Sequence, residues 1–168
     1  NGLTLSHEID GAVIQLSRHA ATLDLLAGVT RDSAADFDSS RPNFSNETDR
    51  HFYGVMLSVR PNARHRPYAY GLVQCDNNPS EVLLAGGTTT EFEYDSHYLG
   101  FGSNGSLSDH LLYGVEFVYE GGNGLSNSVN GAGAAITQTK EDIEALAMNV
   151  RLDYIVNNRN RTRLSGEF

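Results

Sequence analysis

Apolar and polar side chains alternate along much of this chain with a period of two residues. In the clearest stretch, 142–156, five apolar side chains occupy every second position: Leu146, Met148, Val150, Leu152 and Tyr154. Successive side chains of a strand point to opposite faces, whereas a helix turns by about 100° per residue and would mix the two sets. The alternation therefore predicts β-strands with one apolar face and one polar face.

The same alternation recurs along the chain and predicts nine strands. In the stretch 109–120, the apolar row consists of Leu111, Tyr113, Val115, Phe117 and Tyr119. Glycine is frequent, with 17 residues, proline is scarce, with 4, and every aromatic side chain is Tyr or Phe, which is typical of a β-rich chain. The expected strands are 3–9, 12–18, 21–31, 51–60, 67–75, 94–103, 109–120, 142–156 and 161–168.

The connections between these strands alternate between short turns and long polar segments. The short turns are 61–66, 104–108 and 157–160, and the long segments are 32–50, 76–93 and 120–141. Compact soluble domains rarely carry three loops longer than about 15 residues. Outer-membrane barrels, by contrast, have short turns at one end and long loops at the other.

Aromatic residues are expected near both ends of the apolar faces, as in the interfacial girdles of membrane barrels. Tyr53, Phe117 and Tyr119 lie toward the long loops, and Tyr68 and Tyr154 lie toward the short turns. No apolar run approaches the roughly 20 residues of a membrane-spanning helix. The mean hydropathy of −0.36 is compatible with barrel strands, since their alternation averages out.

These patterns predict an all-β fold, namely an antiparallel up-and-down transmembrane β-barrel in contact with a lipid bilayer. Because about nine strands are visible, and single-chain bacterial barrels have an even number, we expect residues 1–168 to form a single barrel segment of a longer chain. The one cysteine, Cys75, leaves no internal disulfide to be formed.

The charge of the chain is strongly acidic and unevenly distributed. The formal net charge is −9, which argues against a nucleic-acid partner, because such binding depends on Lys and Arg. The stretches 32–50, 76–95 and 120–144 carry net charges of −3, −5 and −3. They predict an acidic mouth at the long-loop end, in which the carboxylates of Glu91, Glu93 and Asp95 are solvated. Its candidate residues are Asp32, Asp36, Asp38, Glu91, Glu93 and Asp95.

Two interpretations of this acidic mouth remain open. It is either a plain solvated surface or a place of weak divalent cation binding, since Ca²⁺ prefers clustered carboxylate and carbonyl oxygens. The spacing of Asp32, Asp36 and Asp38 does not match an EF-hand, and the six histidines show no ligand spacing. We therefore predict no metal site and no cofactor.

Polar side chains on the strand faces opposite the apolar rows are candidates to line a channel. The clearest row is Asn149, Arg151 and Asp153, which adjoins residues 163–167 of the following strand. The alternative is a solvated outer face of a soluble sheet, on which cross-strand pairs contribute only about 0.2–1 kcal/mol each. The candidate lumen residues are Arg60, Glu116, Asn149, Arg151, Asp153, Arg163 and Glu167.

Two short stretches contain the residue types of a hydrolase triad. They are Asp95-Ser96-His97 and Ser108-Asp109-His110. Neighbouring side chains of a strand point to opposite faces and cannot form a triad, and the chain has no GxSxG motif. We therefore predict that the protein is not an enzyme.

Several blocks of the chain resemble the alginate-export family of outer-membrane barrels, in particular its branch in planctomycete-type bacteria. The blocks are GVTRDSAADFDSSRP at 28–42, HFYGVMLSVRP at 51–61, PYAYGLVQCDNN at 67–78, YDSHYLGFGSNGSLSDHLLYGVEFVYEGGNGLSNS at 94–128 and EDIEALAMNVRLDYIVNNRNRTRLSGE at 141–167. The resemblance implies a monomeric channel of about 18 strands in a bacterial outer membrane. Roughly half of such a barrel would be present here.

Pattern and resemblance together favour a porin-like channel for passive passage of small solutes or polysaccharide. The acidic mouth predicts that this channel has a mild preference for cations. The alternative is a soluble all-β sandwich module that binds glycans or a protein partner through its long loops. The alternation of side chains alone is compatible with both functions.

Overall fold

The fold is described from a computed structural model, which covers residues 9–30, 49–77, 83–85, 88–90, 93–129, 135–157 and 162–168. Every regular element in these ranges is a β-strand, so the described part of the chain is all-β, as predicted. Within the same ranges, no helix is long and apolar enough to cross a membrane.

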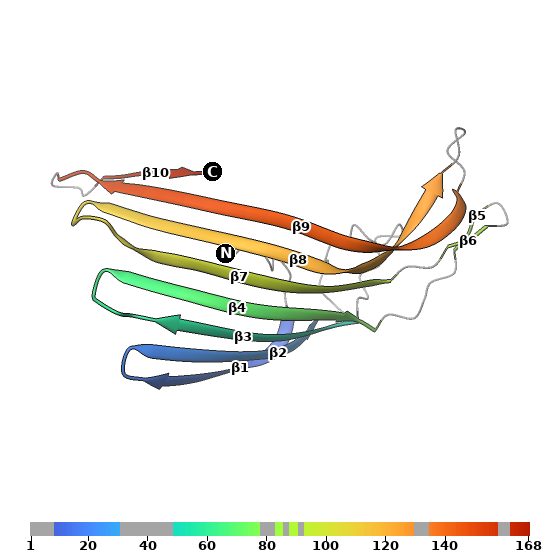
Figure 1. Cartoon of the computed structure of the whole chain (residues 1–168), viewed down its shortest axis with the longest axis horizontal. Helices are drawn as coiled ribbons and strands as arrows, with labels where there is room; N and C mark the ends of the chain where they lie inside the picture. The colour runs from blue at the N-terminus through green and yellow to red at the C-terminus, as the bar shows by residue number, and fades with distance from the viewer. Residues whose placement is uncertain are drawn as a thin grey trace.

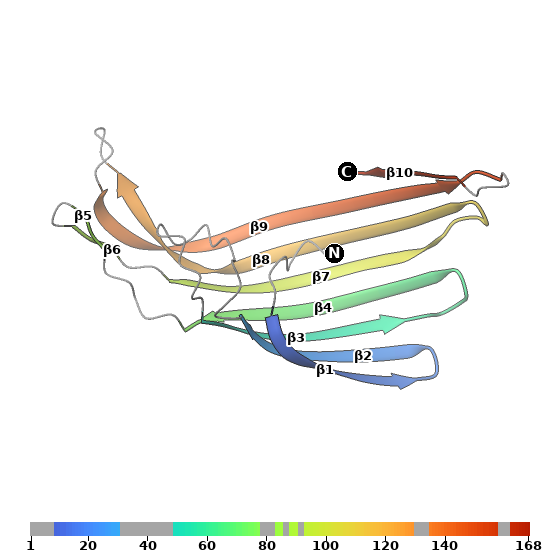
Figure 2. The ribbon, with the colours of Figure 1, turned by 180° about the vertical axis from the view of Figure 1, so that it is seen from behind.

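Eight strands form one antiparallel sheet in the order β1-β2-β3-β4-β7-β8-β9-β10 (Figure 1). Figure 2 shows the same order from behind, with β1 and β10 at the two edges. The strands are β1 (Ile9–Arg18), β2 (Ala21–Thr30), β3 (Arg50–Val59), β4 (His65–Asp76), β7 (Tyr94–Ser106), β8 (Leu111–Val129), β9 (Ala135–Ile155) and β10 (Arg163–Glu167).

The predicted up-and-down arrangement is confirmed for the described strands. Each strand of the large sheet pairs with the strand that precedes or follows it in that sheet, and none of these pairs involves a crossover. Eight of the expected strands correspond to strands of the sheet. The ninth, 3–9, lies outside the described residues except for Ile9, which begins β1.

Two of the three predicted long loops contain strands, so their predicted bounds were wrong. The segment 76–93 includes β5 (Leu83–Ala85) and β6 (Thr88–Thr90), which form a separate two-stranded sheet. In the segment 120–141, β8 continues to Val129 and β9 begins at Ala135. Most of the third segment, 32–50, lies outside the described residues.

The extension of β8 was not predicted because it is rich in glycine, and a glycine contributes nothing to an alternation of side chains. Gly122 is required where it stands, because its φ is 156° and an added Cβ would lie 2.1 Å from the carbonyl oxygen of Asp95. The backbones of β7 and β8 approach closely at this position. The extension is therefore a hairpin of continuous strands rather than a loop.

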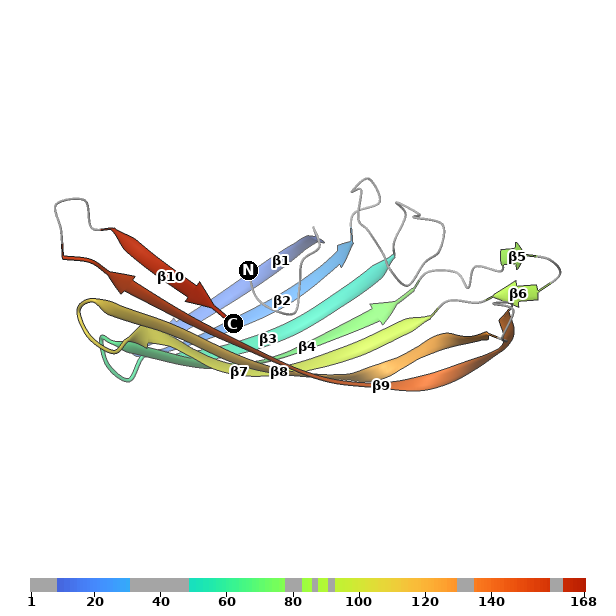
Figure 3. The same cartoon turned by 90° about the horizontal axis from the view of Figure 1, so that it is seen from above.

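The large sheet is curved into a trough, with β1 and β10 as its two rims (Figure 3). A cavity of about 790 Å³ is lined by residues of all eight strands. A single cavity that touches every strand of a curved sheet lies on its concave face. We call this cavity the trough.

The convex face of the sheet is apolar and exposed. Neighbouring strands bring Leu57, Ala69, Phe101, Phe117 and Met148 into one continuous row by direct pairing. The rings of Phe101 and Phe117 stack at 5.2 Å in this row. Among the described residues, the well-exposed large apolar side chains all belong to the convex face except Val13 and Leu107.

The predicted apolar rows of β8 and β9 are confirmed as one face. The pairing of Leu111 with Tyr154, and of every second residue after them, places both rows side by side. Tyr68 was predicted on the apolar face, and this prediction was wrong. Its register in β4 puts it, with Tyr70 and Leu72, on the concave face, where all three line the trough.

The side-chain rings of Tyr68 and Tyr70 lie over two glycines of β7. A Cβ added at Gly100 would lie 2.1 Å from Cζ of Tyr70, and a Cβ added at Gly102 would lie 2.6 Å from Cζ of Tyr68. The two rings therefore fit over β7 because these glycines have no side chains. The rings lie close to the sheet surface and reach toward β8.

We expect Gly100→Ala to destabilise the sheet, because the new methyl group would take the place of the Tyr70 ring. Overpacking of this kind costs about 1–3 kcal/mol in the free energy of unfolding, measured by urea titration. Gly71→Ala is the matched control, since the nearest atom to its added Cβ is Cδ2 of Leu99 at 3.7 Å. Equal losses in the two variants would contradict the assigned role of Gly100.

Candidate functional site

The centre of the trough is built around a carboxylate that is held by a tyrosine. The hydroxyl of Tyr70 donates a hydrogen bond to Oε1 of Glu116 at 2.8 Å. The ring of Tyr68 lies parallel to that of Tyr70, with centroids 6.4 Å apart and planes at 15°. Glu116 pairs in register with Asn149, so a carboxylate and an amide from adjacent strands meet here.

A second carboxylate is held in the same way nearer the long-loop end of the sheet. Oε1 of Glu120 accepts hydrogen bonds from the hydroxyls of Tyr98, at 2.9 Å, and Tyr94, at 2.5 Å. The guanidinium of Arg50 lies 5.7 Å from the ring centroid of Tyr94 and 3.9 Å from Asp76. These contacts fix the side chains where β3, β4, β7 and β8 adjoin.

Arginine side chains gather toward the short-turn end of the concave face. Oδ2 of Asp153 accepts a hydrogen bond from Arg163 at 2.5 Å and forms an ion pair with Nε of Arg151 at 3.1 Å. The Asp153 side chain is 5% exposed, while those of the two arginines are close to half exposed. One buried carboxylate therefore orients two guanidinium groups that remain accessible.

Further hydrogen bonds extend this polar surface across neighbouring strands. Asn149 donates to Glu167 at 2.6 Å, and Arg66 donates to Oγ of Ser58 at 3.0 Å. The trough is thus lined by paired charges and amides rather than by a charge of one sign.

The structure brings six of the seven candidate lumen residues to the concave face. Glu116, Asn149, Arg151 and Glu167 line the trough, and Asp153 and Arg163 follow them toward the short turns. Arg60 does not join them, because β3 ends at Val59. Arg60 is exposed and follows the last residue of β3, and its backbone amide donates to the carbonyl of Ala20 at 2.7 Å.

The β4 residues of the trough were not predicted from the sequence. Arg66, Tyr68 and Tyr70 occupy alternate positions of one strand, so their spacing alone could have indicated that they share a face. Pro67 and Gly71 weaken the apolar row of β4, and this left the two faces of the strand hard to tell apart.

The predicted acidic mouth is only partly within the described residues. Asp32, Asp36, Asp38 and Glu91 lie outside them. Glu93 is described and forms an ion pair with Lys140 at 3.3 Å.

Asp95, also predicted to be solvated, is half-buried instead. Its Oδ1 accepts a hydrogen bond from the backbone amide of Asp76 at 2.8 Å. The expectation for Asp95 was wrong, because this carboxylate joins the ends of β4 and β7 where their regular ladder stops.

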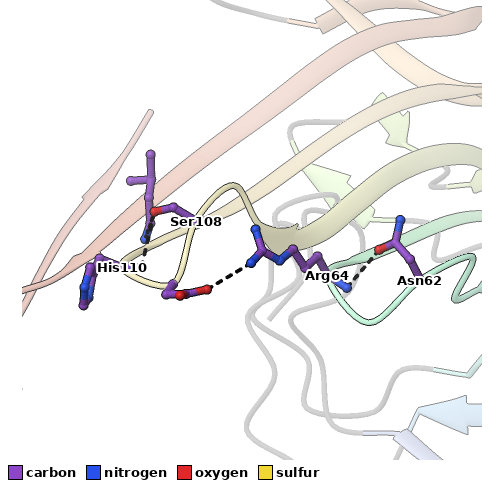
Figure 4. A network of polar contacts seen from close by, with 6 residues as sticks. Asn62, Arg64, Ser108 and His110 are labelled. Atoms are coloured by element: carbon purple, nitrogen blue, oxygen red, sulfur yellow. Dashed lines mark hydrogen bonds and ion pairs between the residues drawn. The ribbon is translucent and has the colours of Figure 1, made fainter.

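The two triad-like stretches have structural roles, one within strand β7 and the other in the turn between β7 and β8. Ser96 is buried and the adjacent His97 is exposed, as expected for neighbours on opposite faces. Oγ of Ser108 accepts from the amides of His110 and Leu111, which closes the turn between β7 and β8 (Figure 4). In the same end region, Arg64 pairs with Asp109 at 3.1 Å and Oδ1 of Asn62 accepts from the amide of Arg64 (Figure 4).

Nothing among the described side chains gathers three or more His, Cys, Asp or Glu residues into a group suited to a metal ion. Fold and side chains together define a curved, up-and-down antiparallel sheet with an exposed apolar convex face and a trough that carries paired charges and amides. No protein-family model matches the chain, and no curated protein matches its sequence.

We expect Asp153→Asn to lower the urea midpoint of unfolding, because the substitution removes the negative charge that two guanidinium groups share. Asp109→Asn is the matched control, since Asp109 is 84% exposed and pairs with one arginine at the surface. Exposed ion pairs contribute little to stability, so this control is expected to leave the midpoint unchanged. A shift of the same size in both variants would contradict the structural role of Asp153.

Proposed function

We propose that this chain forms part of the wall of a porin-like β-barrel in a bacterial outer membrane, which passes small solutes or polysaccharide passively. The observation that carries the proposal is the contrast between the two faces of one sheet. Exposed apolar side chains are found on the convex side of every strand, while the concave side presents paired charges and amides.

The extent of the apolar face supports a lipid environment. Soluble monomers rarely expose contiguous apolar patches larger than a few hundred Å². Here the exposed apolar row continues from Ile14 and Leu16 on β1 to Leu164 on β10, across a sheet of eight strands. Within the described residues, no second layer of structure packs on this face.

Strand lengths also suit a bilayer. A tilted strand crosses the hydrocarbon layer in about 9–11 residues. β1, β2 and β3 have 10 residues each, and β4 and β7 have 12 and 13. The longer β8 and β9 would extend beyond the membrane at the long-loop end.

The concave face suits a water-filled lumen, whose lining in membrane barrels is polar. In this proposal further strands pair with the edges of β1 and β10, beside which the described part of the chain places no other strand. An unpaired edge in lipid would leave backbone groups without hydrogen-bond partners.

We expect Leu99→Arg to impair insertion of the protein into lipid vesicles. Leu99 is 59% exposed in the middle of β7 on the convex face. An arginine facing the bilayer midplane costs about 2–4 kcal/mol. Insertion is measured as protease protection and as the altered gel mobility of the unheated protein.

Leu107→Arg is the matched control for this experiment. Leu107 is 56% exposed but lies in the turn between β7 and β8, outside the sheet. Its substitution is expected to leave insertion unchanged. If both variants stay folded in buffer without detergent, the soluble all-β module replaces the barrel as the better explanation.

We expect charge substitutions in the trough to change ion selectivity in opposite directions. Arg151→Gln removes a positive charge and should increase the preference for cations, and Glu116→Gln should decrease it. The reversal potential of single channels in a salt gradient measures both changes. The effects should weaken as salt rises, because the Debye length falls from about 8 Å at physiological ionic strength to about 3 Å at 1 M.

Asp109→Asn, which lies outside the trough in a turn, is the control for selectivity and should leave the reversal potential unchanged. Strong anion selectivity of the unmodified channel would contradict the proposed cation preference and favour a conduit for polyanions.

A further inference from the structure

Tyr68 and Tyr70 stand out in the trough, because they present aromatic rings in a lining that otherwise carries many polar groups. Aromatic residues of a membrane barrel are expected chiefly in its outer girdles. Both tyrosines instead line the trough from β4, with parallel rings 6.4 Å apart. The proposed channel function does not by itself require this arrangement.

We propose that the trough binds an uncharged, hydroxyl-rich glycan against the rings of Tyr68 and Tyr70. This inference names the solute class of the proposed channel and rests on that function. A sugar ring has an apolar C–H surface and a rim of hydroxyl groups. Its site therefore needs apolar ring surface with a few placed polar groups beside it, which is the usual composition of a small-molecule site.

The polar groups of the trough are of the types that recognise sugar hydroxyls. Glu116 accepts from Tyr70, Arg66 donates to Ser58, and Asn149 donates to Glu167. Each of these side chains lines the trough together with the tyrosines. Carboxylate, guanidinium and amide groups supply both acceptors and donors, and a sugar hydroxyl acts as either.

The site is built before any ligand arrives. The rings of Tyr68 and Tyr70 occupy the space that Gly102 and Gly100 leave open on β7, and the Tyr70 hydroxyl is tied to Glu116. Side chains fixed in this way lose little conformational freedom on binding, which favours affinity. The trough volume of about 790 Å³ falls within the range of ligand sites, roughly 300–1,000 Å³.

The charge of the lining favours an uncharged ligand over a polyanion. Its charged residues are the bases Arg66 and Arg151 and the acids Asp24, Glu116 and Glu167. Because carboxylates outnumber guanidinium groups in this lining, an acidic polysaccharide would meet more like charges than opposite charges in the trough. A neutral glycan avoids this repulsion.

The test is equilibrium binding of maltohexaose, a neutral oligosaccharide, to the purified whole chain, with a hexamer of uronic acid as the anionic probe. Isothermal titration calorimetry measures affinity. Tyrosine fluorescence gives a second readout, since the chain contains no tryptophan. We expect maltohexaose to bind more tightly than the uronic acid hexamer.

Substitutions then locate the site. Tyr68→Ala and Tyr70→Ala should each weaken maltohexaose binding by about three- to tenfold, the loss expected for one aromatic contact. Tyr70→Phe keeps the ring but not the hydrogen bond to Glu116, so its loss should be smaller than that of Tyr70→Ala. Tyr154→Ala, on the convex face, is the matched control and should bind as the unmodified protein does.

Three results would overturn the inference: no maltohexaose binding up to about 10 mM, tighter binding of the uronic acid hexamer, or an equal loss in Tyr154→Ala. Binding is measured without a bilayer, so this outcome is separate from that of the channel. Ion conductance without glycan binding would refute the glycan site alone. Glycan binding by a protein that does not insert into lipid would refute the channel alone.

Discussion

The structure depends on one unbroken ladder of backbone hydrogen bonds. From β1 to β10 the described strands pair with a single register shift, at Ser128 and Val129 in the β8 extension. Since side chains alternate with a period of two, a slip of one residue in any pair would move that strand's apolar row to the trough side. The separation of an apolar convex face from a concave face that carries the paired charges is therefore a property of register. It does not come from a packed interior, because the buried apolar side chains among the described residues are only Phe52, Leu72 and Val118.

Much of this arrangement was predictable from the chain alone, because alternation and turn placement are local signals. The strands, the up-and-down order and the apolar rows that include Phe117 and Met148 follow from them. Six of the seven candidate lumen residues lie on the face expected, since parity along a strand decides the face. Arg60 has the right parity but lies beyond the end of β3, where its amide donates to the carbonyl of Ala20 in the turn between β1 and β2. The end of a strand depends on pairing with the neighbouring segment, which the alternation of side chains does not show.

Side-chain contacts between strands were not predictable in the same way. The support of Tyr70 by Gly100 depends on which residues of β4 and β7 face each other, and the reach to Glu116 spans a further strand. Asp95 illustrates the same limit, since a carboxylate in a polar segment gives no sign that it will accept the amide of Asp76. The composition of a segment indicates its average polarity. The contacts of Tyr70 and Asp95, in contrast, depend on residues far away in the chain.

The connectivity of the sheet also has a consequence for how such a protein changes over evolutionary time. Each strand of the large sheet contacts mainly its neighbours in the chain, so the hairpin is the unit of construction. Duplication or deletion of one hairpin would leave the remaining pairings intact and would widen or narrow the curved wall by two strands. The width of the curved sheet is thus adjustable in discrete steps of two strands, independently of the residues that line the trough.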